Sequence, residues 1–342
     1  MRIAYLLEST GLSGGAKVAF QQAEELARRR HAVTVVSPEE RPRWFPLSRA
    51  AFERAEFSRS EALAGSEIAV ATFWTTVAPA VTSAGGAVFH LCQGYEAAFE
   101  AYASRRDEIL AAYALPARKL VIAPHLRETL LRAGHGESEV VGQTFEAGEF
   151  AVAARPPRET LTILLPGIDV GDVKGVREAL RSLAGLRRRG VKFRLARVSA
   201  EPVSRWEASL GVTDEYHREV PPPRMRFLYA SADIFLGPSR IEDGFDLPAL
   251  EALASSLPAA VSDTPAHRHA LGDAAVYFAP KDERAIAEAV EGLLSDEATR
   301  RRLSALGPDR AGRFRTSEVA DRLEAIFTAA LAERRSAPVS HA

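Results

Sequence analysis

The sequence predicts an α/β protein built from two doubly wound domains that face each other across a cleft. At 342 residues the chain is longer than one hydrophobic core usually supports. Short apolar runs of strand length alternate with helical patterns in two successive series, which is typical of parallel sheets covered by helices. A proline-rich break near residues 150–158 separates the two series. Two α/β domains joined by a linker follow from these observations.

The boundaries follow from the same patterns. We expect an N-terminal Rossmann-like domain over residues 1–152, a linker over 153–159 and a C-terminal Rossmann-like domain over 160–312. A further helix is expected over 313–334, and its packing against the N-terminal domain is one arrangement open to it. Residues 335–342 are expected to form a frayed tail.

Composition excludes several classes of protein. Hydrophobic residues make up 46% of the chain, charged residues 26%, and the net charge is −1, so no global field favours nucleic acid. No apolar run approaches the length of a membrane span, and the strand-like start at residues 1–7 is too short for a secretory signal. The single cysteine, Cys92, allows no internal disulfide, and we expect it to pack as a small hydrophobe. A cytoplasmic protein is therefore expected.

The first series of elements opens with a βαβ unit. We expect strands at 3–7, 32–37, 68–72, 88–91, 119–123 and 139–141, helices at 16–30, 99–114 and 127–133, and an irregular loop with a short helix at 40–60. Gly14 and Gly15 precede the first helix, where a missing side chain lets a ligand approach the backbone. The loop lacks G-x-G-x-x-G, which disfavours a dinucleotide-binding dehydrogenase. A plain strand–helix turn stays open as the alternative.

Polar and aromatic residues follow two strands of this series. In open α/β sheets, ligands bind outside the carboxyl ends of the strands. We therefore expect the following side chains to line the cleft: Trp74, His90, Gln93, Tyr95 and Glu96. A single histidine at a strand end is more often structural, so that alternative stays open for His90.

The second series ends in helices. We expect strands at 161–165, 193–198, 232–236, 259–262 and 275–278, and helices at 175–189, 225–230, 282–294, 297–305 and 317–332.

An acidic turn and a helix start follow the strand at 232–236. Asp246 is a good N-cap, and Pro248 is tolerated in a first helical turn. The backbone N–H groups of residues 244–247 would then lie at the positive end of a helix dipole, where phosphate binds. Two carboxylates, Asp243 and Glu251, flank the turn. N–H donors beside carboxylates suit a nucleotide sugar, although an acidic surface turn is the alternative.

Around this turn the sequence resembles the retaining family 4 glycosyltransferases of the GT-B fold, the group 1 glycosyltransferases. That family has two acidic residues separated by seven others around a Gly-Phe-Gly-Leu-Pro turn, a spacing that residues 243–251 share. The likeness continues through 257–265 and 272–278, and residues 11–16 are similar to the family's first loop. It is strong over 228–300. Gln-Gly-Tyr-Glu after the strand at 88–91 is similar to a subgroup that includes polysaccharide rhamnosyltransferases.

The resemblance implies transfer of a sugar from a nucleotide donor to a hydroxyl acceptor, with retention at the anomeric carbon and with no metal or other cofactor. Glu251 would bind the ribose hydroxyls, and Asp243 would bind hydroxyls of the donor sugar. Lys174 would neutralise the departing diphosphate. The backbone around Gly244, Phe245, Asp246 and Leu247 would face the diphosphate, which Gly14 and Gly15 would cap. His90 would orient the acceptor or the sugar, with Trp74, Gln93, Tyr95 and Glu96 on the acceptor side.

Three residues depart from the family pattern. Asp243 stands where the family usually has Glu, and Asp246 replaces the second glycine of the turn. Lys174 is kept, but Asp169 stands where the family has an arginine. Arg240, just before the acidic pair, is the candidate to replace that missing cation.

The expected partners are a UDP-, GDP- or dTDP-linked sugar and a glycan or lipid-linked acceptor of surface polysaccharide synthesis. The basic runs at 28–30 and 105–106 offer peripheral contact with an anionic membrane, although basic residues at helix ends are more often solvated. Two rival functions stay open. One is a sugar-nucleotide epimerase or hydrolase on the same scaffold. The other is a catalytically silent sugar-nucleotide-binding subunit, to which the lost arginine lends weight.

Overall fold

The computed structural model describes residues 1–152, 158–169, 174–240 and 244–336. The chain divides into two compact units, each with one parallel sheet. Unit 1 contains Met1–Ala98, Tyr102–Phe145 and Phe314–Ala342, and unit 2 contains Phe99–Ala101 and Glu146–Arg313. The predicted α/β class with two doubly wound sheets is confirmed.

The sheet of unit 1 has seven parallel strands in the order β3-β2-β1-β4-β5-β6-β7. The strands are β1 (Arg2–Leu6), β2 (Ala32–Ser37), β3 (Ala51–Arg54), β4 (Ile68–Ala71), β5 (Ala87–Cys92), β6 (Arg118–Val121) and β7 (Ser138–Val140). The helices are α1 (Gly14–Arg28), α2 (Glu61–Ala64), α3 (Trp74–Ser83), α4 (Arg106–Ala114), α5 (Pro124–Arg132) and α13 (Thr316–Ser336), with short 3-10 turns at Phe57–Arg59, Glu96–Ala98 and Glu100–Arg105. The strand order reverses between β1 and β4, the kind of switch point at which such sheets bind ligands.

Helix α1 shows why the sequence folds this way. The side chain of Ser13 accepts a hydrogen bond from the N–H of Ala16 and caps the helix start. The face predicted from helical spacing, which includes Val18 and Leu26, is buried against the sheet.

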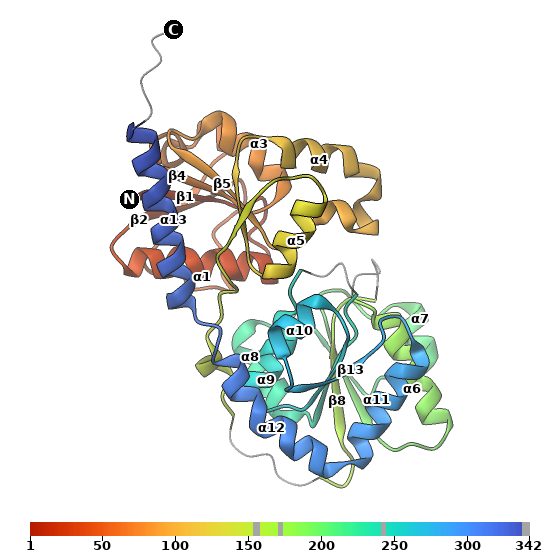
Figure 1. Cartoon of the computed structure of the whole chain (residues 1–342). Coiled ribbons are helices and arrows are strands. Elements are labelled where there is room, and N and C mark those ends of the chain that lie inside the picture. The colour runs from red at the N-terminus through yellow and green to blue at the C-terminus, as the bar shows by residue number, and fades with distance from the viewer. Residues whose placement is uncertain (153–157, 170–173, 241–243, 337–342) are drawn as a thin grey trace. The chain divides into compact units, whose positions relative to one another are not determined.

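Helix α13 packs against α1 in unit 1 and crosses it in the view of Figure 1. The ring of Phe327 packs 4.9 Å from that of Phe89 in β5, between ring centroids. The Arg29 guanidinium after α1 pairs with Asp321 at 2.5 Å and Glu324 at 2.7 Å. These contacts make the last helix part of the hydrophobic core of unit 1.

The sheet of unit 2 has six parallel strands in the order β10-β9-β8-β11-β12-β13. The strands are β8 (Thr162–Pro166), β9 (Arg194–Ser199), β10 (Glu215–Arg218), β11 (Ile234–Gly237), β12 (Ala259–Ser262) and β13 (Ala275–Phe278). The helices are α6 (Val176–Arg188), α7 (Arg205–Leu210), α8 (Pro222–Ser231), α9 (Leu247–Ala254), α10 (Pro265–Leu271), α11 (Glu283–Ser295) and α12 (Glu297–Ala311), with a 3-10 turn at Ala147–Phe150. The central strands β11 and β12 are buried along their whole length, as strands covered on both faces are.

The predictions missed the outer strands β3 and β10. Both are four residues long, carry charged side chains and bury no residue fully, so neither shows the apolar run of a buried strand. The helices α3, α7 and α10 were also missed. The single helix expected over 99–114 is a 3-10 turn followed by α4.

Candidate functional site

Two loops of unit 2 meet at the carboxyl ends of the neighbouring strands β8 and β11. Gly175 closes the first loop with a left-handed φ of +60°. A Cβ added there would lie 2.1 Å from the carbonyl oxygen of Pro238 in the second loop. Since no side chain fits, this glycine sets the close approach of the two loops.

Lys174 belongs to the first loop and lies near Asp246 of the second. Burial alone would raise the pKa of the Asp246 carboxyl, but the hydrogen bond from His267 and the charge of Lys174 hold that pKa below its usual range. The structure thus brings together two residues that the sequence placed in one site.

The position of Asp246 is as predicted, but its side chain acts differently. It is the N-cap residue of α9, yet its carboxylate accepts no capping hydrogen bond. Instead Oδ2 lies 3.0 Å from Nε2 of His267 and 3.4 Å from the hydroxyl of Ser239. The expectation that this carboxylate caps the helix is therefore wrong, because a buried histidine holds it.

Glu251 lies in the second turn of α9, with 7% of its surface exposed. Its Oε2 accepts a hydrogen bond of 2.8 Å from the hydroxyl of Tyr229 in α8. Burial, followed by the neighbouring carboxylate, raises the pKa of Tyr229 well above its usual value, so its hydroxyl stays a donor. Sequence reasoning missed Tyr229, which belongs to an ordinary helical pattern with no motif around it.

Helix α8 also borders a cavity of about 740 Å³ at the carboxyl end of β10. The cavity is lined by Arg218 and Pro221 from the loop and by Arg224 and Phe227 from α8. The Phe227 side chain is 60% exposed. Helix α8 therefore carries both the exposed ring of Phe227 at this cavity and the Tyr229 hydroxyl that donates to Glu251.

Three other predicted donor-binding residues lie in the same turn. Phe245 is half-buried, and its ring centroid lies 6.4 Å from that of His269; Gly244 and Leu247 are buried. Asp243 lies outside the described residues, so its prediction is not placed by the structure.

Asp169, which stands where the family has an arginine, and Arg240, the candidate replacement for that arginine, are both engaged within unit 2. Oδ2 of Asp169 accepts a 2.6 Å hydrogen bond from the hydroxyl of Ser204, which in turn caps α7. Arg240 donates to Glu178 of α6 at 2.9 Å, and only 7% of its surface is exposed. The carboxylate of Glu178 neutralises this guanidinium, which argues against Arg240 as the replacement phosphate cation.

The buried side chain of Arg197 is hydrogen-bonded to the backbone at the start of the first loop. Arg197 in β9 donates to the carbonyl oxygens of Leu165 and, at 2.9 Å, Gly167, where β8 ends. Its Nε lies 2.8 Å from Oε1 of Glu207 in α7, and both side chains are fully buried. The end of β8 is thus fixed by a buried ion pair.

In unit 1 the first loop and the end of β5 are in contact. Gly14 and Gly15 are the first residues of α1. The side-chain amide of Gln93 donates to the carbonyl of Gly15 at 3.2 Å, and a Cβ added to Gly15 would lie 3.3 Å from that nitrogen. Contact of these glycines with a donor stays a prediction.

His90 does not lie at a strand end as expected. It is inside β5, is 1% exposed and packs its ring 4.8 Å from that of Tyr113, between centroids. Burial, helped by the nearby charge of Lys119, lowers the pKa of His90 to about 3. This burial is what the structural alternative for His90 describes, and the role of orienting an acceptor stays a prediction.

The acceptor-side residues are also more enclosed than predicted. Glu96 is 5% exposed and accepts a 2.6 Å hydrogen bond from the hydroxyl of Tyr113, and burial raises its pKa. The hydroxyl of Tyr95 lies 2.9 Å from Nε2 of His135. Trp74 begins α3 and is buried, with the guanidinium of Arg105 4.4 Å above its ring. Of these residues, Gln93 and Tyr95 keep partial exposure.

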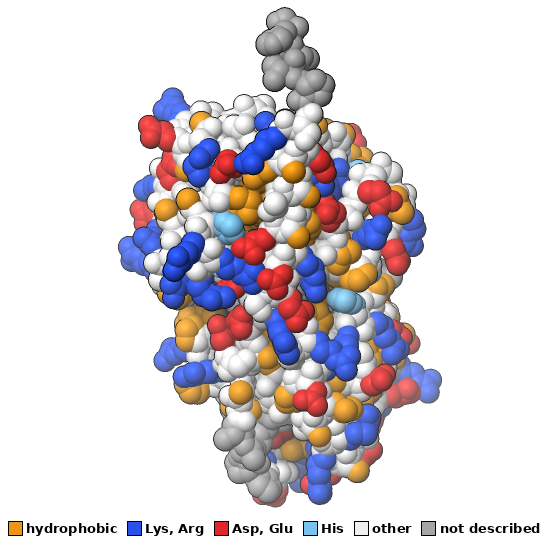
Figure 2. Space-filling view, turned by 60° about the vertical axis from the view of Figure 1, so that its left-hand side comes forward, with side chains coloured by type: hydrophobic (Ala, Val, Ile, Leu, Met, Phe, Trp, Pro, Cys, Tyr) orange, Lys and Arg blue, Asp and Glu red, His pale blue; other side chains and the backbone are white. Residues whose placement is uncertain are grey.

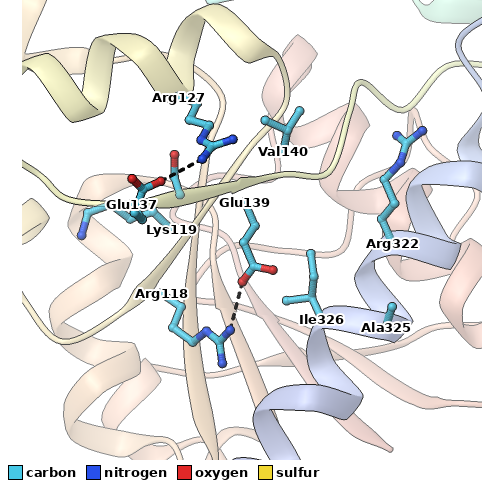
Figure 3. Close-up of a pocket in the computed structure, with 10 residues that line it drawn as sticks. Arg118, Lys119, Arg127, Glu137, Glu139, Val140, Arg322, Ala325 and Ile326 are labelled. Atoms are coloured by element: carbon cyan, nitrogen blue, oxygen red, sulfur yellow. Dashed lines mark hydrogen bonds and ion pairs between the residues drawn. The ribbon is translucent and has the colours of Figure 1, made fainter.

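The second cavity lies at the opposite edge of the sheet of unit 1. It measures about 690 Å³ and is bordered by the starts of β6 and β7 and by α13. Figure 3 shows two ion pairs in its lining: Arg118 contacts Glu139 at 3.1 Å and Arg127 contacts Glu137 at 2.9 Å. It is distant from the carboxyl strand ends and does not belong to the predicted site.

The basic runs considered for membrane contact are engaged in ion pairs. Arg28 and Arg29 both contact Glu25, at 2.6 and 3.0 Å, and Arg105 contacts Glu108 at 2.8 Å. On the face in Figure 2, basic and acidic side chains are interspersed. Within the described part of the chain, no helix is both long and apolar enough to cross a bilayer. The same described residues contain no group of three or more His, Cys, Asp or Glu side chains that could hold a metal.

Comparison with known proteins finds a family model that matches the segment carrying this site. Residues 161–296 match the model of the glycosyl transferases group 1 family. The O-antigen chain mannosyltransferase RfbU of Salmonella typhimurium is 36% identical over 69 residues, which are 20% of this chain and 19% of that protein. The O-antigen chain mannosyltransferase B of Escherichia coli is 35% identical over 95 residues, or 28% of this chain and 25% of that protein. The matches thus span a quarter or less of these relatives' length.

Solved structures match over nearly the whole chain. HepE of Anabaena, in complex with UDP and glucose, has a TM-score of 0.76 at 12% identity, covering 96% of this chain and 99% of that one. WaaG, a glycosyltransferase involved in lipopolysaccharide biosynthesis, has a TM-score of 0.72 at 16% identity, covering 95% and 99%. These likenesses confirm the predicted GT-B fold. Residues 161–296, which carry the turn after β11 together with Lys174 and Glu251, are thus similar to the glycosyl transferases group 1 family.

Proposed function

We propose that the protein transfers a sugar, with retention, from a nucleotide-sugar donor to a hydroxyl of a glycan or lipid-linked acceptor in surface polysaccharide synthesis. One observation carries the proposal. Lys174, Asp246 and Glu251 are gathered at the carboxyl ends of β8 and β11 inside the segment that matches the group 1 family. Two relatives named O-antigen chain mannosyltransferases support the polysaccharide context.

Each part of the donor has a candidate place in unit 2. The carboxylate of Glu251, fixed by Tyr229, is a strong acceptor for the ribose hydroxyls. The N-terminus of α9 and the ammonium of Lys174 would stabilise charge that grows on the departing diphosphate. Asp243 would hold hydroxyls of the donor sugar.

The cavity at β10 is the candidate place for the nucleoside base. Strands in a sheet lie about 4.8 Å apart, and β10 is three positions from β11, so the end of β10 is about 14 Å from the turn after β11. That separation suits a nucleotide lying along the sheet edge. The exposed ring of Phe227 offers an apolar surface for a base to pack against.

The reaction needs no metal in this proposal, because Lys174 and the helix dipole supply the positive charge. The departing phosphate itself would receive the acceptor proton during attack on the same face. Transfer is therefore expected to be unchanged by chelation with EDTA.

The test is incubation with UDP-, GDP- and dTDP-sugars and a panel of glycan and lipid-linked acceptors, with mass detection of product. We expect product with the wild type, a large loss with Glu251→Gln or Lys174→Met, and no loss with Glu288→Gln. Glu288 is the control because it is an exposed carboxylate on α11, paired with Arg284. Nucleotide binding without turnover would indicate a silent subunit, and nucleotide release without glycosylated product would indicate a hydrolase.

A further inference from the structure

Asp246 and His267 form a buried pair directly below the turn after β11. Asp246 is 5% exposed and His267, in α10, is fully buried. Space for the carboxylate depends on Gly237, since a Cβ there would lie 3.3 Å from Oδ2 of Asp246. In the sequence only Asp246 stands out, because it occupies a position where the family has glycine, and nothing there indicates His267 as its partner.

Both ring nitrogens of His267 face acceptors. Nε2 lies 3.0 Å from the Asp246 carboxylate, and Nδ1 lies 2.7 Å from the carbonyl oxygen of Ser262. The Ser262 hydroxyl is farther from Nδ1, at 3.2 Å, and itself donates to the carbonyl of Ser239. A histidine can donate to both acceptors at once only as an imidazolium, and in that form its contact with Asp246 is an ion pair.

This pair leaves the start of α9 uncapped by Asp246. An N-cap aspartate normally accepts a hydrogen bond from the N–H of the second or third helical residue. The second residue is Pro248, which has no N–H, so a capping Asp246 would use the N–H of Ala249. The ion pair with His267 holds the carboxylate away from that position.

We propose that His267 is a positioning residue for donor binding: its ion pair cancels the charge of Asp246 and keeps the N-terminus of α9 open to a diphosphate. The inference rests on the proposed function, because it assumes that the turn receives a diphosphate. Without His267, the carboxylate would turn toward the helix start and compete there with an external anion. This explains how the chain tolerates an acidic residue at a phosphate turn.

The test is titration calorimetry with UDP and GDP at one pH, on wild type, His267→Gln, Asp246→Gly and the double variant. We expect His267→Gln to weaken binding by roughly tenfold or more, because the Asp246 carboxylate loses the partner that holds it at 3.0 Å and its negative charge remains near the diphosphate and Lys174. Asp246→Gly in the same chain should restore affinity to within about threefold of wild type, since the interfering group is gone. A purely structural histidine would give no such rescue.

Several results would overturn the inference. One is unchanged binding by His267→Gln, and another is a double variant no better than His267→Gln. If His267→Gln does not fold, the single variant Asp246→Gly provides the test. It should bind UDP or GDP with an affinity within about threefold of wild type, and a loss of affinity beyond about tenfold would overturn the inference. Nitrogen NMR of labelled histidine gives an independent readout, in which we expect one imidazolium that becomes neutral in Asp246→Gly. A wild type that binds none of the nucleoside diphosphates UDP, GDP and dTDP would contradict the proposed function itself.

Discussion

Replacement of Arg197 by methionine is predicted to destabilise unit 2 strongly. The guanidinium donates to Glu207 at 2.8 Å and to two carbonyl oxygens at the end of β8, with no exposed surface on either side chain. Methionine fills similar volume but leaves the buried Glu207 carboxylate without the guanidinium, beside the hydroxyl of Thr213 at 3.2 Å. Breaking a buried pair in this way costs about 3–5 kcal/mol.

The matched control is the exposed pair between Arg301 and Glu297 on α12. Its side chains are 76% and 65% exposed, so Arg301→Met should cost only about 0.3–0.5 kcal/mol. A variant in which both Arg197 and Glu207 become methionine should recover part of the loss, because it leaves no unpaired buried charge.

Urea unfolding followed by tryptophan fluorescence provides the assay. Trp206 adjoins Glu207 in α7, whereas Trp44 and Trp74 belong to unit 1. A background carrying Trp44→Phe and Trp74→Phe therefore reports unit 2 alone. A cost below about 1 kcal/mol for Arg197→Met, or one equal to that of Arg301→Met, would refute the reasoning about this buried pair.

Three further predictions concern single positions. Gly175→Ala should lower the free energy of unfolding in urea by at least about 2 kcal/mol and abolish nucleotide binding. The control Gly190→Ala, at φ +87° with open space around the added Cβ, should lower it by about 1 kcal/mol. Equal losses in the two variants would contradict the steric argument. Tyr229→Phe removes the hydroxyl that donates to Glu251 and should lower the free energy of unfolding by about 1.5–3 kcal/mol. It should also weaken UDP or GDP binding in calorimetry, and unchanged affinity would contradict this prediction. The pKa of His90, about 3, lies below that of an unfolded histidine, so its neutral form contributes stability above about pH 6.5 that is lost as pH falls toward 3. That loss is roughly 3 kcal/mol at pH 4 and should be absent in His90→Leu; acid titration with an unchanged midpoint would disprove it.

The turn after β11 was predictable because its signals are local. Asp246 at the N-cap position and Pro248 in the first turn mark the start of α9 within a few residues. The resemblance then fixed the position of Glu251. The outer strands β3 and β10 were not predictable, since their charged side chains hide the apolar pattern.

The partners of the site residues depend on contacts distant in sequence. His267 lies 21 residues after Asp246, and Tyr229 lies 22 residues before Glu251, so no local pattern joins them. His90 is instructive in another way. Its neighbours in β5 are apolar and the strand is buried along nearly its whole length, which places His90 in the core, yet its position near the expected strand end favoured a ligand role.

The central claim is that unit 2 holds the donor through Glu251. The most direct measurement is calorimetric titration of UDP, GDP and dTDP and their sugars into wild type and Glu251→Gln. We predict that one nucleotide series binds the wild type and that Glu251→Gln weakens this binding by about tenfold or more, since a charge-assisted hydrogen bond contributes about 1.5–3 kcal/mol. Equal affinity of the two proteins, or no binding by the wild type, would contradict the claim.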